Sequence, residues 1–553
     1  MSSSGFELRF WGGVPPEQGG YPGFNPRTET KAERVCGYDV AVPMRDGKRL
    51  FADVFRPPEE GKYPAIIAYS PYGKHNRIYG MFHRCGVSDA DLSEDCAYEG
   101  PDPGYWCPRG YVVINVDTRG TWHSEGDLTY MTEQEAQDGY DVIEWAAAQE
   151  WCNGKVGMAG VSYLAWSQWR IASLQPPHLA AINPWEGVSD FYRELSYHGG
   201  IPETYFNPQL KGFLSFTTTK AEDMVGVAAE HPFFDDYWRS KNADLSQITV
   251  PAFVVASWSD QGLHTRGTLE GFRRISSADK WLLVHGRKKW QYFHEQADMQ
   301  REFFNKFLKG IKSEVDYWPK VQLEIRERYY RGNYRGENEW PLARTQYTPL
   351  FLDPKEKTMV PSPVGEPGDV RYRVNDIKDK TQNAQFTATF DQATELTGYM
   401  KLKLWVEAAG SDDLDLFVAL EKINRSGEVV RFPFFSSHEG GPVALGWLRV
   451  SHRELDESRS TPYQPVHPHT GEVKLGEGEI VPVEIEILPS STRFEPGEKL
   501  RLIVQGSDIY YYQYPEGWWP GNAHEQTVNR GDHVIHAGGK YDSHLLVPVI
   551  PIG

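Results

Sequence analysis

Apolar and polar positions divide the chain into two differently patterned parts. In the first part, up to about residue 312, continuous apolar runs alternate with segments whose apolar residues recur at helical spacing. Such runs cover residues 63–70, 110–117, 250–256 and 280–284, and they are typical of strands buried on both faces of a parallel sheet. In the second part, short alternating segments are separated by Gly, Pro and Asp, which is typical of antiparallel β-structure; they include residues 321–326, 397–406, 415–421, 483–488 and 500–504.

Several elements can be assigned from this pattern. Asp46-Gly47 lies between two alternating runs within residues 38–55, which predicts a β-hairpin. Residues 133–150 have apolar positions at helical spacing and acidic residues early, and therefore predict a helix. Residues 157–173 read as a strand followed directly by a helix. Because strands and helices alternate with short links, the sequence predicts a parallel sheet with right-handed crossovers.

The same pattern predicts the domain organisation. It indicates a mostly parallel sheet with flanking helices, interrupted by a helical cap insertion and followed by a carboxyl-terminal all-β jelly roll. The expected segments are an extended amino-terminal arm (1–35), the first part of the α/β domain (36–187), the cap (188–249), the second part of the α/β domain (250–312) and the jelly-roll β-sandwich (313–553).

Composition narrows the possible partners and the location. The formal net charge of −18 argues against nucleic acid, because a phosphate-binding surface needs clustered Lys and Arg. No run is long and apolar enough for a membrane span, and no secretory signal begins the chain, so a cytoplasmic protein is expected. The five cysteines show no Cys-x-x-Cys spacing. They are interpreted as reduced thiols, with a disulfide among Cys85, Cys96 and Cys107 as the alternative.

A Gly-x-Ser turn at Gly160 to Ser162 offers a candidate nucleophile. A sharp turn between a strand and a helix exposes a serine oxygen and requires small neighbouring residues, as in the nucleophile elbow of α/β-hydrolases. Leu164 replaces the second glycine of the usual Gly-x-Ser-x-Gly pattern. The triplet alone is therefore a weak signal, because many such triplets are ordinary loops.

Two later strand ends supply the partners that a serine nucleophile needs. Asp260 follows the run 250–256, and His285 follows the run that ends at Val284. Their order after the serine is that of an α/β-hydrolase triad, in which the carboxylate orients the histidine that accepts the serine proton. His294 is the alternative base, and His264 is disfavoured as too close in sequence to Asp260. Asp260 could instead cap a turn, and a lone histidine beside a strand is more often structural.

An oxyanion hole and a substrate pocket can also be proposed. The backbone N–H of Tyr163 follows the nucleophile, and Tyr72 could offer a second donor through its phenol, unless it only forms a turn. The substrate pocket candidates are Arg119, Glu186, Asp190 and Trp258. Arg119 could bind a carboxylate or form a buried ion pair, and Glu186 and Asp190 could bind a substrate amine or begin a cap helix.

Further segments carry a family resemblance. In the first half these segments are residues 42–47, 52–57, 70–74, 117–120, 138–141, 151–157 and 160–164. In the second half they are residues 395–398, 446–449 and 543–548. With them the chain resembles, from about residue 36 onward, the CocE/NonD hydrolase family, which includes cocaine esterase, the α-amino-acid ester hydrolases and the X-prolyl dipeptidyl peptidases.

The resemblance assigns roles to individual positions. It implies Ser162 as nucleophile, Asp260 as acid and Tyr72 as oxyanion donor. In this family a tyrosine follows the nucleophile and a glycine comes one place later, which accounts for Leu164; Ala165 stands at that glycine position. The family's Gly-Pro-Trp-x-His segment is replaced by residues 284–290. The resemblance also implies that the jelly roll helps to close the pocket, where the aromatic segment 510–519 could line it or serve interdomain packing.

The expected activity is hydrolysis of a carboxylic ester, or of an amide, through an acyl-enzyme. The substrate would be a small molecule, with no nucleic-acid or membrane partner and no metal or organic cofactor; a homo-oligomer is compatible with the sequence. One alternative is an acyltransferase with the same triad, and another is a non-catalytic binding protein that retains the fold. Dipeptidyl peptidase activity is disfavoured, because peptidase members generally carry larger insertions.

Overall fold

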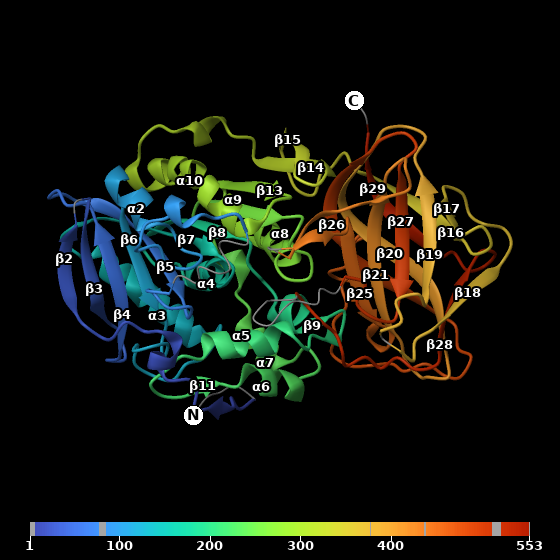
Figure 1. Cartoon of the computed structure of the whole chain (residues 1–553), viewed down its shortest axis with the longest axis horizontal. Helices are drawn as coiled ribbons and strands as arrows, with labels where there is room; N and C mark the ends of the chain where they lie inside the picture. The colour runs from blue at the N-terminus through green and yellow to red at the C-terminus, as the bar shows by residue number, and fades with distance from the viewer. Residues whose placement is uncertain are drawn as a thin grey trace.

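The computed structural model describes residues 6–31, 33–76, 85–376, 378–435, 438–510 and 521–551. Its first domain is built on one long sheet (Figure 1). Across the sheet the strands are β2 (Arg27–Lys31), β3 (Arg34–Pro43), β4 (Arg49–Arg56), β6 (Val112–Asp117), β5 (Tyr63–Ser70), β7 (Cys152–Val161), β8 (Leu179–Trp185), β12 (Ala252–Ser257), β13 (Lys280–His285), β14 (Val321–Arg328) and β15 (Arg331–Glu337). The strands from β6 to β14 run parallel, as the apolar runs predict.

The central strands are buried on both faces because successive side chains point to opposite sides. In β12, Phe253 and Val255 belong to one apolar core, whereas Val254 and Ala256 belong to the other. Helices α3 (Glu133–Ala147) and α8 (Thr265–Arg274) pack into the core that contains Val254. Helix α10 (Ala297–Phe304) packs into the core that contains Phe253, and α4 (Tyr163–Ala172) contributes to both. The prediction of a mostly parallel sheet with flanking helices is confirmed.

Between β8 and β12 the chain forms a separate group of short elements. These include α5 (Phe206–Leu214), α6 (Met224–Glu230) and α7 (Asp236–Lys241), which lie together at one side of the molecule (Figure 1). The amino-terminal segment, expected as an extended arm, pairs with the rest of the protein at two places. Its strand β1 (Phe10–Trp11) pairs with β11 (Ala221–Glu222) in this group, and β2 extends the main sheet next to β3.

The second domain consists of mostly antiparallel strands with an apolar core of its own. Its main strands are β16 (Gln346–Asp353), β17 (Thr358–Val360), β18 (Gly368–Arg373), β19 (Asn383–Thr389), β20 (Thr394–Ala409), β21 (Asp415–Ile423), β25 (Ala444–Arg449), β26 (Val481–Phe494), β27 (Lys499–Gln505), β28 (Asp532–Ala537) and β29 (His544–Ile550). The alternating pattern of residues 397–406, 415–421, 483–488 and 500–504 therefore predicted strands correctly.

One strand assigned to this second domain belongs to the first. Residues 321–326 were expected in the β-sandwich, but β14 pairs in parallel with β13, and β15 pairs with β14. The alternating pattern did not reveal this, because an edge strand of the first sheet has the same pattern as a strand of a sandwich. At its end β14 also meets β26, where Arg326 pairs with Thr492 and its guanidinium donates to Ser490 Oγ at 2.6 Å. The two domains thus share a hydrogen-bonded junction.

The cysteines and the helices agree with two further expectations. All five cysteines are buried and none is joined in a disulfide, so the expectation of reduced thiols is confirmed and the alternative of a disulfide among Cys85, Cys96 and Cys107 is wrong. Within the described parts of the chain, the helices are too short or too polar to cross a membrane.

Candidate active site

Ser162 lies at a strained turn between β7 and α4. Its φ of 59° and ψ of −114° are unusual for a non-glycine residue, and its backbone N–H donates to the carbonyls of Trp185 and Glu186 at 3.0 Å each. Two residues earlier, Gly160 has a φ of 142°, and a Cβ there would lie 2.5 Å from the Leu164 side chain. The turn therefore has the geometry of a nucleophile elbow, which projects the serine side chain away from the sheet.

The helix after the serine tolerates Ala165 because a glycine faces it. A Cβ on Gly187 would lie 2.7 Å from the Ala165 Cβ and 3.2 Å from the Ser162 carbonyl oxygen. The position at which the family commonly has glycine is thus occupied by alanine, and the space is provided by Gly187 on the segment after β8. The close approach of these two segments holds the elbow against the sheet.

Asp260 and His264 meet Ser162 from the loop after β12. The Asp260 carbonyl accepts from the backbone N–H groups of Leu263, His264 and Thr265 at 3.2, 3.1 and 3.2 Å, so the loop forms a tight turn that leads into α8. This turn brings His264 Nδ1 into a hydrogen bond with Asp260 Oδ2. The other ring nitrogen, Nε2, lies 3.1 Å from Ser162 Oγ.

These contacts define the tautomer of His264. An ionised carboxylate can only accept, so Nδ1 must carry the proton that is donated to Asp260. Nε2 is then unprotonated, and its lone pair can accept the hydrogen of the Ser162 hydroxyl. Serine, histidine and carboxylate are therefore connected in the order that a catalytic triad requires.

His285, the base expected from the sequence, lies elsewhere. It ends β13 as expected, but its Nε2 lies 3.0 Å from Glu186 Oε1, and its Nδ1 accepts the backbone N–H of Arg287 at 3.1 Å. Both ring nitrogens are engaged, so the ring donates to Glu186. The expectation that His285 pairs with Asp260 and Ser162 is therefore wrong in this structure, because His264 holds both of those contacts.

The alternative base, His294, also lies elsewhere. It is half-buried near the end of α9 (Lys289–Glu295), where its ring packs against Phe293 with centroids 5.1 Å apart. Burial lowers the pKa of His294 to about 4.

The carboxylate and the imidazole of the candidate triad are both buried, at 1% and 3% exposure. Burial disfavours ionisation of Asp260, but the Lys289 ammonium and His264 outweigh it, so the pKa of the carboxyl lies well below its usual range. Burial, and after it the charge of Lys289, lowers the pKa of His264 to about 4. At neutral pH the structure therefore contains an ionised Asp260 and a neutral His264.

Tyr72 and Tyr163 also lie beside the serine. The Tyr72 hydroxyl donates to Ser162 Oγ at 3.5 Å and also contacts the backbone N–H of Tyr163. Burial, together with the nearby Glu99 carboxyl, raises the pKa of Tyr72 well above its usual value, so the phenol remains a donor. The phenol of Tyr163 donates to Glu135 at 2.9 Å, which anchors the start of α4 to α3. The two predicted oxyanion donors are thus brought together beside the serine.

The four proposed pocket residues are all engaged with the protein. Arg119 forms two 2.6 Å hydrogen bonds with Asp138, Asp190 pairs with Arg193 at 2.7 Å, Glu186 pairs with His285, and the Trp258 indole donates to the Glu324 carbonyl at 2.9 Å. For Arg119 the structure shows the ion pair rather than a free guanidinium. In the aromatic segment 510–519, only Tyr510 is within the described residues, and it donates to Glu421.

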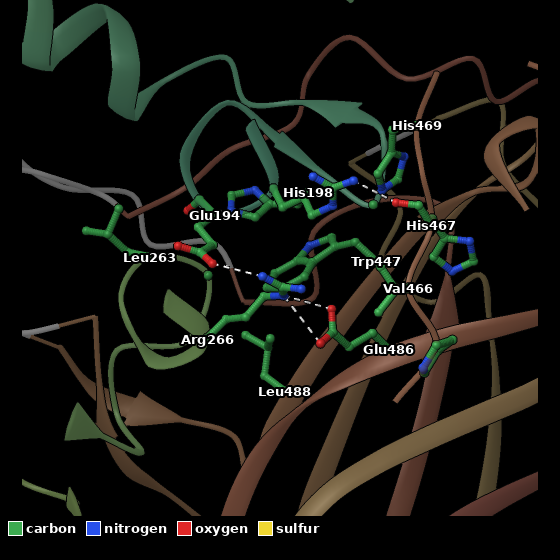
Figure 2. A pocket seen from close by; sticks show the side chains of 14 residues that line it. Glu194, His198, Leu263, Arg266, Trp447, Val466, His467, His469, Glu486 and Leu488 are labelled. Atoms are coloured by element: carbon green, nitrogen blue, oxygen red, sulfur yellow. Dashed lines mark hydrogen bonds and ion pairs between the residues drawn. The ribbon is translucent and has the colours of Figure 1, made fainter. Parts of the chain in front are cut away.

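A polar cavity lies next to the triad loop, between α8 and the second domain (Figure 2). In it Arg266 bridges Glu194 and Glu486 at 2.9 and 3.0 Å. The cavity leaves only about 50 Å³, enough for a few water molecules, and its lining includes neither Ser162 nor His264. Its ion pairs fasten the start of α8, and with it the loop that carries His264, to the β-domain.

His264, the histidine that contacts the serine, was disfavoured as a base from the sequence. A signal for it was present: residues four apart lie on the same face when the intervening chain makes one helical turn, so the Asp260 to His264 spacing is suited to contact. Lys289, in the segment that replaces Gly-Pro-Trp-x-His, was also missed. Its Nζ lies 3.4 Å from Asp260 Oδ2 and 3.2 Å from His264 Nδ1.

Comparison with known proteins gives a consistent set of relatives. Residues 46–224 match the X-Pro dipeptidyl-peptidase (S15) family, and residues 313–546 match the X-Pro dipeptidyl-peptidase C-terminal non-catalytic domain. A crystal structure of a CocE/NonD family hydrolase from Staphylococcus aureus is similar, with 43% identity, a TM-score of 0.91 and coverage of 95% of this chain and 96% of that one.

Two curated proteins are similar at lower identity. Cocaine esterase from Rhodococcus sp. (strain MB1 Bresler) is 26% identical over 93% of this chain and 98% of its own length. A putative Xaa-Pro dipeptidyl-peptidase from Bacillus anthracis is 25% identical over 85% of this chain and 82% of its own length. These relatives include both esterases and peptidases.

Proposed function

The chain belongs to the CocE/NonD family of hydrolases, and from this premise we propose that it cleaves carboxylic esters through an acyl-enzyme on Ser162. The observation that carries the proposal is the chain of contacts from Ser162 Oγ to His264 Nε2, at 3.1 Å, and from His264 Nδ1 to Asp260. A serine hydroxyl becomes a useful nucleophile only when such a base can take its proton.

In the proposed first step, Ser162 Oγ attacks the ester carbonyl while its proton moves to His264 Nε2. Asp260 holds the imidazole in the correct tautomer and stabilises the imidazolium that forms. The carbonyl oxygen becomes an oxyanion, and we assign its stabilisation to the Tyr72 hydroxyl and the Tyr163 N–H, which converge beside the serine.

The second half of the reaction uses the same groups. Collapse of the tetrahedral intermediate breaks the bond to the leaving alcohol, which takes its proton from His264. His264 then removes a proton from water, the resulting hydroxide attacks the acyl group, and Ser162 leaves with the proton returned to it. Every proton transfer in this scheme passes through one ring nitrogen, Nε2.

The contacts of the acidic residues favour ester over peptide substrates. A dipeptidyl peptidase would have to bind the positive amino terminus of its substrate. The two carboxylates suggested for that task, Glu186 and Asp190, are already paired with His285 and Arg193 at 3.0 and 2.7 Å. An ester with a neutral acyl group needs no such counter-charge, so we place esters ahead of amides.

The proposal also assigns roles to the segments around the candidate active site. We assign residues 188–249 as a helical cap over the strand ends of an α/β-hydrolase domain, and the carboxyl-terminal β-domain as a jelly roll that closes the pocket. The ion pairs of Arg266 with Glu194 and Glu486 support a fixed relation between the triad loop, the cap and the β-domain.

A fluorophosphonate probe tests the chemistry directly. Wild-type protein should be labelled at Ser162, and Ser162→Ala should not be labelled. Absence of labelling in folded wild-type protein would contradict the enzyme proposal. A panel of p-nitrophenyl esters, aminoacyl esters and aminoacyl-prolyl p-nitroanilides then ranks the substrates. If the p-nitroanilides are turned over faster than every ester, the choice of esters over peptides is wrong.

A further inference from the structure

Lys289 is a buried cation in direct contact with the candidate triad. It is the first residue of α9, its side chain is 4% exposed, and its Nζ lies 3.4 Å from Asp260 Oδ2 and 3.2 Å from His264 Nδ1. Three other groups face His264 or Lys289 from different elements: Ser162 from the elbow, Glu186 from the end of β8 and Glu99 from the loop before α2 (Pro103–Trp106).

The charges around Lys289 keep it protonated. Burial disfavours the ammonium form, but Asp260, Glu99 and Glu186 outweigh it, so the pKa of Lys289 is raised. Glu99 is itself fully buried, receives the Trp290 indole N–H at 2.8 Å, and has its pKa raised by burial to about 7. The ammonium therefore lies among three carboxyl groups, and its hydrogen-bond contact is with Asp260 Oδ2, at 3.4 Å.

A cation at this place acts differently on the two protonation states of His264. When His264 is neutral, Lys289 and Asp260 form an ion pair against the Nδ1 side of the ring. When His264 is protonated at Nε2, the imidazolium and the ammonium are adjacent like charges inside a region with little water. Like charges at this separation disfavour the protonated histidine.

We propose that Lys289 is a positioning residue of the candidate triad, whose ammonium group holds Asp260 in place and keeps His264 in the neutral form that a general base requires. This inference rests on the proposed function, because it assigns Lys289 a role through His264. The pKa of His264, lowered to about 4 by burial and then by the charge of Lys289, agrees with this geometry. The expected consequence is an esterase that remains active in mildly acidic solution.

The sign of the effect can be measured. Because His264 must be neutral to accept a proton, kcat/KM falls as pH decreases through the pKa of His264 in the free enzyme. In wild-type protein the midpoint of this fall, called here the acid limb of the pH profile, should be near pH 4. Removing the positive charge by Lys289→Met or Lys289→Gln should move the limb to higher pH by about 1 to 3 pH units, the usual effect of a charge at this distance.

The experiment compares kcat/KM for p-nitrophenyl acetate over this pH range, with released p-nitrophenol quantified by chromatography, in wild type, Lys289→Met, Lys289→Gln and Lys288→Met. Lys288 is the matched control: it precedes Lys289 but pairs with the exposed Glu439 at 3.0 Å, so its loss should leave the limb in place. The pH dependence of fluorophosphonate labelling provides a second readout that does not depend on deacylation.

The possible results separate this inference from the proposed function. A limb that moves upward in both Lys289 variants and stays in Lys288→Met supports the inference. A limb that does not move in a folded Lys289 variant, or failure of both Lys289 variants to fold, overturns it in favour of a purely structural lysine. If His264→Gln retains wild-type turnover, the proposed base itself is wrong, whatever the Lys289 variants do.

Discussion

The identity of the catalytic base can be tested by making one substitution at two histidines. Glutamine has nearly the length of histidine and keeps an N–H donor and an oxygen acceptor, but its amide cannot accept a proton at neutral pH. We therefore compare His264→Gln with His285→Gln. The structure predicts opposite results for the two variants, since His264 contacts Ser162 and His285 contacts Glu186.

For His264→Gln we expect kcat/KM to fall by about 10⁴- to 10⁶-fold, the range for removing a triad histidine. This corresponds to about 5 to 8 kcal/mol of transition-state stabilisation. His285 is not in place to substitute for it, because both ring nitrogens of His285 are engaged within the protein. The fold should persist, since Lys289 still faces Asp260 at 3.4 Å and compensates its charge.

For His285→Gln we expect kcat/KM within about tenfold of wild type, because the amide can still donate to Glu186 and accept from the Arg287 N–H. The cost should fall on stability instead, by about 1 to 3 kcal/mol for an imperfectly satisfied buried pair. Ester turnover and thermal unfolding, measured on the same preparations, separate the two quantities. A folded His264→Gln variant with near-normal turnover, combined with an inactive His285→Gln variant, would refute the assignment.

Three further substitutions have defined outcomes. Tyr72→Phe removes one oxyanion donor and should lower kcat by about 10²- to 10³-fold with little change in melting temperature, and an unchanged kcat would exclude the phenol from the oxyanion hole. Gly187→Ala should overpack the elbow against Ala165 and destabilise the protein by about 1 to 3 kcal/mol. Adding Ala165→Gly should recover part of that loss in thermal unfolding, and strictly additive effects would argue against the contact. Arg119→Met leaves Asp138 buried without its partner and should cost about 3 to 5 kcal/mol of stability, whereas a raised KM with unchanged stability would restore a substrate role.

The fold could be predicted because its central strands have an unambiguous pattern. Runs such as residues 63–70 and 250–256 are apolar on both faces, and this requires cover on both sides of a sheet. The candidate nucleophile Ser162 and the candidate acid Asp260 were selected by the same reasoning, since parallel strands bring their carboxyl ends to one edge. The pattern assigned β14 to the wrong domain, because an alternating strand fits either domain. Only the hydrogen bonds of β14 to β13 place it in the first sheet.

The candidate base, His264, could not be selected in this way because it does not directly follow a strand. His264 lies within a turn whose shape depends on three hydrogen bonds to the Asp260 carbonyl. A rule that looks for the base directly after a strand selects His285 instead. His285 does lie at the end of a strand, but its ring contacts Glu186 and not Ser162. Which neighbour a buried imidazole contacts depends on packing with residues far away in sequence, such as Glu186.

Both histidines are nevertheless connected to Ser162: His264 contacts its hydroxyl, and His285 contacts Glu186, whose carbonyl accepts the Ser162 N–H. Glu186 has a φ of 47°, and its carbonyl accepts the Ser162 N–H at 3.0 Å. By donating to the Glu186 side chain, His285 holds this strained residue in place and thereby holds the elbow. The strand-end histidine thus supports the nucleophile through the backbone, while His264, carried by the same loop as Asp260, reaches the hydroxyl. Because Asp260 and His264 share one turn, a shift of that loop would move them together and keep the hydrogen bond between them.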